Sequence, residues 1–181
     1  MEIFQSQTQS EQVATMLMAR NLRVVHLTTH KSLKIACDYV NYKNILDKLI
    51  LTEKYFTQWN ISNPKIGVAA LNPHASDGGL IGNEEFDEIL PAINEAKKNG
   101  INAIGPVPAD TIFNQAISGA YDVVLAMYHD QGLIPFKTLS FSEGVNYTSG
   151  LNIVRTSPVH GTAYDIAGKN IADEQSFRES V

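Results

Sequence analysis

The sequence predicts an α/β fold in which helices cover a β-sheet. The main observation is a set of four short apolar runs, separated by longer segments with apolar residues at helical spacing. The runs that we interpret as strands are residues 22–28, 66–71, 101–108 and 121–128. No repeat, linker or low-complexity segment divides the sequence, so we expect residues 1–181 to form a single α/β unit.

The segments between these strands carry the signals of helices. Residues 34–59 have apolar positions at helical spacing and predict either one long helix or two. Residues 83–100 begin with acidic residues and end with two lysines and a glycine, an order that suits the helix dipole and a glycine stop. Pro91 lies inside this pattern and predicts a kink or a break. Residues 109–119 predict a short helix before the last strand.

The composition excludes several classes of function. The net charge is −5 and the isoelectric point is near 5.5, so no basic excess is available for nucleic acid or an acidic membrane surface. No apolar run approaches the roughly 20 residues of a membrane-spanning helix. The single cysteine, Cys37, fits a reducing compartment, and the polar N-terminus does not resemble a secretory signal. We therefore expect a soluble, cytoplasmic protein with no nucleic-acid or membrane partner.

Three of the five histidines follow directly after predicted strands. These are His30, His74 and His129. Ligands of α/β proteins gather at the carboxyl ends of strands, and imidazole is a common ligand of divalent cations. Any one of these residues alone would be an ordinary surface or helix-capping histidine. Because three occupy equivalent positions, we expect them to converge on one divalent cation, whereas His26 lies within a strand and is interpreted as structural.

Two loops rich in small residues suggest contact with a phosphate or a nucleotide. Residues 77–85 (DGGLIGNEE) form either a flexible cap for the next helix or a backbone that an anion can approach. Residues 160–169 (HGTAYDIAGK) combine small groups that suit an adenine ring with a carboxylate, Asp165. That carboxylate can accept hydrogen bonds from ribose hydroxyls, and its charge would repel a 2′-phosphate.

Six motifs occur along the chain: TTHKSLK, LNPHASDGG, GPVPADTIF, AMYHDQGLIPFK, GVNYTSGLNIVRTS and HGTAYDIAGK. In this order and spacing they resemble the 4-hydroxythreonine-4-phosphate dehydrogenase family of pyridoxal phosphate biosynthesis. The resemblance runs from about residue 2 to the C-terminus. The last motif also looks like the adenosine-binding loop of the isocitrate and isopropylmalate dehydrogenase superfamily. The resemblance implies part of an isocitrate/isopropylmalate dehydrogenase-like three-layer α/β/α sandwich.

The resemblance implies an NAD-dependent and divalent-metal-dependent reaction. In this family, 4-phosphooxy-L-threonine is oxidised and decarboxylated to 3-amino-2-oxopropyl phosphate. The implied metal ligands are His30, His74 and His129, and the metal would be Zn, Mg, Co or Mn. The family resemblance also implies a homodimer whose active site is shared between the two subunits.

The same resemblance assigns roles to residues in the C-terminal half of the chain. Lys137, Asn146 and Arg155 are implied to bind the phosphate and carboxylate groups of the substrate. We interpret His129, Asp130 and Lys137 as catalytic; Asp130 would orient a ligand or relay a proton, or be an ordinary strand-end acid. The implied cofactor-binding residues are His160, Gly161, Thr162, Ala163, Asp165 and Ile166.

The chain also departs from the family pattern. The family enzyme is about twice as long, and Met1 falls where the family has the Thr of a GHT motif. We therefore expect a fragment without the N-terminal half, which folds and dimerises but does not turn over substrate. The departures within the motifs are Ala70 for Gly, Ser76 and Asp77 for Gly and Glu, Asn152 for Pro, and Val159 for Asp.

Two alternative functions stay open. The first is a paralogue that acts on 4-phospho-D-threonate or 4-phospho-D-erythronate in sugar-acid catabolism. The stretch EIFQSQTQS near the start looks closer to that branch. The second is a non-catalytic remnant that dimerises or binds nucleotide without turnover.

Overall fold

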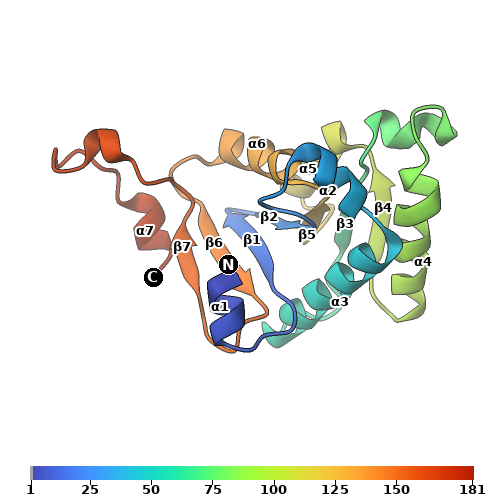
Figure 1. Ribbon diagram of the computed structural model, residues 1–181, viewed down its shortest axis with the longest axis horizontal. Helices are drawn as coiled ribbons and strands as arrows, with labels where there is room; N and C mark the ends of the chain where they lie inside the picture. Colours follow the sequence, from blue (N-terminus) through green and yellow to red (C-terminus); the bar gives the residue numbers. More distant parts are fainter. Residues whose placement is uncertain (1) are drawn as a thin grey trace.

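The computed structural model describes residues 2–181 as one mixed β-sheet with helices on both of its faces (Figure 1). The strands are β1 (Ala14–Ala19), β2 (Leu22–His26), β3 (Ile66–Ala69), β4 (Ala103–Val107), β5 (Val123–Ala126), β6 (Val145–Ser149) and β7 (Thr156–Pro158). Their order in the sheet is β4-β3-β5-β2-β1-β6-β7. The first four strands in this order pair in parallel, and the pairs β2–β1, β1–β6 and β6–β7 are antiparallel.

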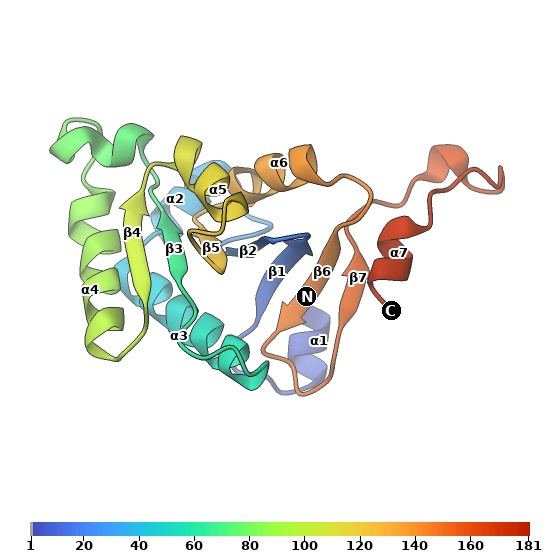
Figure 2. The same ribbon diagram turned by 180° about the vertical axis from the view of Figure 1, so that it is seen from behind.

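The α-helices are α1 (Glu2–Gln7), α2 (Leu33–Tyr39), α3 (Tyr42–Gln58), α4 (Leu90–Lys98), α5 (Ala109–Ile117), α6 (His129–Leu139) and α7 (Gln175–Glu179). Helices α3 and α4 cover one face of the sheet, and α5 and α6 cover the other, as the two opposite views show (Figures 1 and 2). This arrangement confirms the predicted three-layer α/β/α architecture. Within residues 2–181, no helix combines the length and the apolar character needed to cross a membrane.

Alternate side chains of the central strands fill the two cores, because successive strand residues point to opposite faces of the sheet. On β2, Val25 packs in the core beneath α3 and α4, whereas Val24 packs in the core beneath α5 and α6. Leu125 and Val124 of β5 divide between the two cores in the same way. The sheet is therefore buried on both faces, as its continuous apolar runs predict.

The predicted elements are present with shorter bounds. The four predicted strands correspond to β2, β3, β4 and β5. The segment 34–59 forms two helices, because the chain becomes extended at Val40, the C-cap of the first helix. Asn41 then caps the second helix, since its side-chain oxygen accepts a hydrogen bond from the N–H of Asn44 at 3.0 Å. Pro91 lies in the first turn of α4, directly after a π-helical turn at Glu85–Ile89, where a missing N–H costs little.

The sequence does not predict strand β1, the β6–β7 hairpin or helix α6. Strand β1 (ATMLMA) contains one β-branched residue, so its strand preference is weak, and it forms by pairing with β2 and β6. Helix α6 contains Gly132 and Pro135, two residues that disfavour helices, and it is held by packing on the sheet.

Helix α6 approaches β2 closely because Gly132 has no side chain. A Cβ atom at position 132 would overlap with Nε2 of His26 and lie 2.8 Å from Cγ1 of Val24. Both side chains are buried, so neither can move without disturbing the core.

We expect Gly132→Ala to destabilise the protein by about 1–3 kcal/mol, because the added methyl group overpacks the contact between α6 and β2. Urea unfolding measures this change as a lower midpoint. Gly161→Ala is the matched control, since a Cβ atom there meets no other atom within 4 Å. Equal midpoints for the two variants would contradict the close packing of α6.

Candidate active site

Three adjacent parallel strands end at the same edge of the sheet. Strand β5 lies between β2 and β3 and pairs in parallel with both. His30 follows β2, His129 begins α6 directly after β5, and His74 lies in the 3-10 turn Pro73–Gly79 after β3. The structure thus places all three histidines beyond the carboxyl ends of neighbouring strands.

Two buried side chains tie these strand ends together at the backbone of Met127. The hydroxyl of Thr28, beyond β2, donates to the carbonyl of Met127 at 3.0 Å. The side-chain oxygen of Gln131 accepts from the N–H of Met127 at 2.7 Å, and its amide nitrogen donates to the carbonyl of Ala70, beyond β3, at 2.8 Å. These hydrogen bonds are shielded from water, so they fix the three segments that carry the histidines relative to one another.

His30 and His129 lie side by side, with their ring centroids 6.1 Å apart. Nδ1 of His129 lies 2.6 Å from Oδ1 of Asp130, which fixes the orientation of the His129 ring. Nε2 of His129 is therefore the ring nitrogen available to a ligand. The pair, with Asp130, also lines a cavity of about 260 Å³ on the side of α2.

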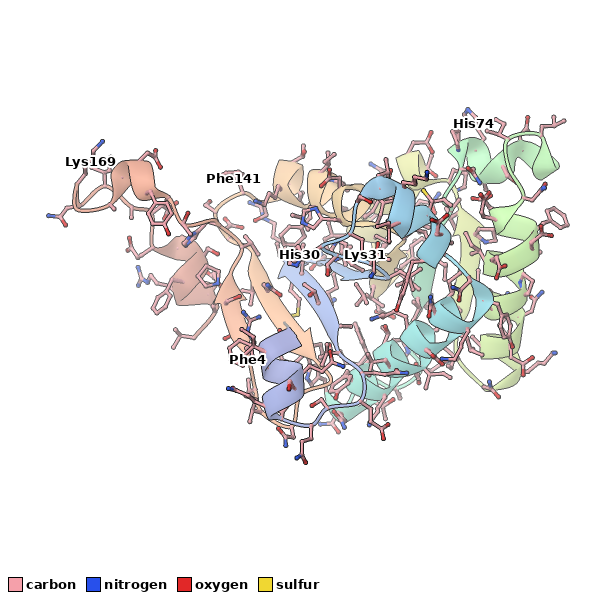
Figure 3. All side chains as sticks on the ribbon, viewed as in Figure 1. Phe4, His30, Lys31, His74, Phe141 and Lys169 are labelled. Carbon is pink, nitrogen blue, oxygen red and sulfur yellow. The ribbon has the colours of Figure 1, made fainter. Side chains whose placement is uncertain are left out.

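His74 lies apart from this pair. It is exposed, and Figure 3 shows it at the outer end of the molecule while His30 lies near the middle. Five successive residues from His74 to Gly78 have left-handed backbone angles, with φ between 44° and 69°. Residues 2–181 contain no group of three His, Cys, Asp or Glu side chains that could hold a metal ion. One chain therefore brings two of the three predicted metal ligands together.

A second cavity of about 260 Å³ lies on the other side of the histidine pair and gathers six of the predicted site residues. Two of these residues lie on α6 and two in the β6–β7 hairpin, so both elements contribute to the cavity beside the ends of β2 and β5. The lining contains no Asp or Glu, so the cavity has a positive character within an acidic protein. The six residues are His30, His129, Lys137, Asn146, Arg155 and His160.

Several polar groups of this cavity are only partly satisfied by the protein. Nη1 of Arg155 donates to the hydroxyl of Thr148 at 2.8 Å, and the guanidinium lies 5.2 Å from the ring centroid of Phe4. Oδ1 of Asn146 is buried without a hydrogen-bond partner. Nζ of Lys137 lies 5.6 Å from the ring centroid of Phe141. Buried polar groups are normally paired, so the unpaired oxygen of Asn146 calls for a hydrogen-bond donor, and the two cations beside it call for a negative charge. Together they indicate a site for a polar anionic ligand that also carries a hydroxyl group.

His26, which we interpreted as a structural histidine, also lines this cavity. It is 1% exposed, and neither ring nitrogen has a partner with hydrogen-bond geometry. Burial, followed by the neighbouring His129, lowers the pKa of His26 to about 4, against smaller raising effects from the backbone of His129 and Thr15. The ring is thus neutral at physiological pH, with one nitrogen a donor and the other an acceptor.

The predicted cofactor loop is mostly remote from the cavity. His160 lines the cavity, with Nδ1 2.9 Å from the carbonyl of Gly161. The following residues run into a segment that projects from the body of the molecule and contains a short 3-10 turn, Tyr164–Ile166 (Figure 1). Gly161, Thr162, Ala163 and Asp165 are exposed, and Ile166 is half-buried. Their roles in binding a cofactor stay a prediction, and Met1, the position compared with the GHT motif, lies outside the described residues.

Sequence reasoning missed the contributions of β1 and α3 to this region. Thr15 and Leu17 of β1 line the cavity, and Lys48 of α3 lies close enough to His26 to affect its pKa. The apolar character of residues 14–19 is a signal for a buried strand, but nothing local indicates that the strand lies beside β2 and β6.

Comparison with known proteins identifies close relatives. The profile of the family described as pyridoxal phosphate biosynthetic protein PdxA matches residues 1–181. A curated relative from Oceanobacillus iheyensis, provisionally named a D-threonate 4-phosphate dehydrogenase, is 48% identical over 99% of this chain and 54% of its own length. The 4-hydroxythreonine-4-phosphate dehydrogenase of Aquifex aeolicus is 52% identical over 90% of this chain and 50% of its own length.

A solved structure has the same fold. The crystal structure of 4-hydroxythreonine-4-phosphate dehydrogenase from Klebsiella pneumoniae is 41% identical and matches with a TM-score of 0.90, covering 99% of this chain and 55% of its own. The chain thus spans about half the length of the relatives that it matches.

Lys48 is a half-buried cation next to this site. Its Nζ donates to the carbonyl of Val13 at 3.1 Å, and burial lowers its pKa from 10.5 to about 8. Between these two values the unfolded chain holds a proton that the folded protein has released. The stability therefore rises with pH over this window, and the full penalty of burying the charged amine is present at pH 7.

We expect Lys48→Met to raise the free energy of unfolding at pH 7 by about 1–3 kcal/mol, because the stem is kept and the buried charge is removed. The gain should shrink as the pH rises from 8 to 10.5. Urea unfolding at pH 7 and at high pH measures both effects. Lys54→Met, on an exposed position of the same helix, is the control. A Lys48→Met midpoint below that of the wild type at pH 7 would show that the buried charge is not destabilising.

Proposed function

We propose that this chain, which belongs to the family of pyridoxal phosphate biosynthetic protein PdxA, carries the active-site residues of a dehydrogenase for a phosphorylated hydroxy acid. The observation that carries this proposal is the carboxylate-free cavity in which Lys137, Asn146 and Arg155 meet the His30–His129 pair. The names of the relatives from Aquifex aeolicus and Klebsiella pneumoniae support the same class of reaction.

The cationic side of the cavity would bind the phosphate group. Thr148 holds one nitrogen of Arg155, so the planar guanidinium can present its other donors to a tetrahedral anion. Lys137 adds a second positive charge from α6. The unpaired oxygen of Asn146 would accept a hydrogen bond from a substrate hydroxyl, and its amide nitrogen would donate one to the phosphate.

The histidine pair supplies donor atoms of the kind that a divalent metal prefers. It supplies too few of them to hold the metal alone. Two imidazoles whose centroids are 6.1 Å apart, with Asp130 beside them, supply nitrogen and oxygen donors that suit such an ion. When bound, the metal supplies Lewis acidity at a substrate oxygen. We propose that exposed His74 completes the set from a second chain, in a homodimer with shared active sites.

NAD is the proposed hydride acceptor. Support comes from His160, which lies at the cavity wall and begins the small-residue loop that leads away from it. In this arrangement the carboxylate of Asp165 would bind the adenosine ribose. Its negative charge would disfavour the 2′-phosphate of NADP.

The proposed substrate is 4-phosphooxy-L-threonine, which would be oxidised and decarboxylated to 3-amino-2-oxopropyl phosphate. The alternative is 4-phospho-D-threonate or 4-phospho-D-erythronate, in which a hydroxyl replaces the amino group. Two observations favour the alternative. The cavity has no carboxylate to pair with an ammonium group, and the Oceanobacillus iheyensis relative is named for D-threonate 4-phosphate. A non-catalytic remnant is the remaining candidate, and it is supported only by the half-length match.

We expect a polypeptide extended to the full length of the relatives to reduce NAD with at least one of these three phosphorylated acids, and the 181-residue chain alone to show no turnover. Absorbance of NADH measures the reaction. Arg155→Leu should lower kcat/KM by about 100-fold or more, because one anion-binding group is lost from a buried site. Arg178→Leu, at an exposed position, is the control. Absence of NAD reduction with all three acids would leave the non-catalytic candidate.

We expect His74→Ala and His129→Ala each to lose tightly bound divalent metal, while His160→Ala keeps it. Elemental analysis of the purified proteins measures this. The two defective chains should recover up to one metal per dimer when they are mixed and reassembled, because a mixed dimer contains one site with His74 and His129 intact on different chains. Full metal content in both single variants would refute the proposed ligands, and no recovery in the mixture would refute ligands from two chains.

A further inference from the structure

A third hollow, which we call the Lys48 cavity, lies beside the candidate active site and has no part in the function proposed so far. Its volume is about 190 Å³. It contains two lysines and several hydroxyl groups, and no Asp or Glu lines it. The two lysines are Lys31 and Lys48, and His26 and His30 lie in the same lining.

The Lys48 cavity shares a wall with the cavity of about 260 Å³ that contains Lys137, Asn146 and Arg155, which we call the Arg155 cavity. Thr15, His26, Thr29 and His30 line both of them. His26 lines both hollows and belongs to this shared wall. The two hollows therefore form neighbouring lobes on either side of the histidines.

The cations of the Lys48 cavity have no carboxylate partner inside it. Nζ of Lys48 donates to the carbonyl of Val13, and Nζ of Lys31 lies 4.9 Å from the ring centroid of Tyr39. On its outer side Lys48 borders a hollow that contains Glu11 and Asp47. Asp47 is paired with Lys43 at 2.8 Å, and no ion pair of Lys48 within 4.0 Å occurs among the described residues. An ammonium group has three donors, so Lys48 can bind an additional acceptor.

We propose that Lys48 and Lys31 bind the carboxylate of the same substrate whose phosphate is bound by Arg155, Lys137 and Asn146. This inference rests on the proposed function, because a phosphorylated hydroxy acid has an anionic group at each end. The carbon that is oxidised would then lie at the shared wall, next to His30. Two separated anion sites select a doubly anionic substrate over a simple phosphate ester.

The experiment compares two ligands that differ only in the carboxylate. 4-Phospho-D-erythronate has a carboxylate at the end opposite to its phosphate, whereas D-erythritol 4-phosphate has a hydroxymethyl group there. Calorimetric titration gives the affinity of the protein for each. We expect the wild type to bind the acid roughly tenfold or more tightly, the effect of one charge-assisted contact. Lys48→Met should reduce this preference to near unity and leave the affinity for D-erythritol 4-phosphate unchanged.

Two matched variants separate this inference from the proposed function. Lys54→Met lies on the exposed side of the same helix and should keep the full preference. Arg155→Leu should weaken both ligands by a similar factor, because both contain the phosphate. Retention of the full preference in Lys48→Met, or equal binding of both ligands by the wild type, would overturn the carboxylate site and leave the phosphate site standing. Failure of the wild type to bind either ligand would overturn both.

Discussion

The candidate site depends on the backbone of Met127. This residue follows the central strand β5, and its N–H and carbonyl groups are bound by the side chains of Gln131 and Thr28. Gln131 continues to the carbonyl of Ala70, so the ends of β2, β5 and β3 are joined through buried hydrogen bonds. These contacts extend the backbone pairing of β2, β5 and β3 beyond the strands, to the loops that carry His30, His74 and His129. Catalytic groups need positions fixed to a fraction of an ångström, and a buried network of this kind provides that precision.

The turn at His74 is also held in place by a buried side chain, but its backbone conformation is strained. Four successive residues other than glycine, His74 to Asp77, have left-handed backbone angles, which cost about 1–2 kcal/mol each. Buried Glu85 holds the turn, because its Oε1 accepts hydrogen bonds from the N–H groups of Leu71 at 2.8 Å and Asn72 at 2.7 Å. Strain of this kind persists where the surroundings enforce it, and it is common at functional sites. Here it leaves the imidazole of His74 exposed, as the proposed contact with a second chain requires.

The sequence predicted what local patterns control. Apolar runs located the four parallel strands, and the residues after them located the histidines, because the carboxyl ends of parallel strands share one edge. The Arg155 cavity followed only from the family resemblance, since Lys137 and Arg155 look like ordinary surface cations by themselves. The separation of His74 from His30 was not predictable, because it arises from a left-handed turn that no propensity favours. The place of His26 and Lys48 in one cavity was missed for a different reason. The wall of that cavity includes β1, and the pairing of β1 with β2 depends on contacts that local sequence patterns do not reveal.

Several polar groups of this region are buried without a partner of opposite charge or a full set of hydrogen bonds. His26 is buried and neutral, Oδ1 of Asn146 has no hydrogen-bond partner, and the half-buried cation Lys48, whose pKa is lowered, donates to the carbonyl of Val13 rather than to a carboxylate. Each of these features destabilises the fold, and all three residues line cavities that contain no Asp or Glu, although Lys48 also borders an outer hollow with Glu11 and Asp47. A protein with a net charge of −5 has many acidic residues that could pair with Lys48, Lys137 and Arg155, so the absence of carboxylates from the two cavities is informative. The simplest physical account is a ligand whose negative charge pairs with the cations and whose hydroxyl group donates to Asn146. Binding of that ligand would then stabilise the fold as well as begin the reaction, because the ligand binds the folded chain and not the unfolded chain.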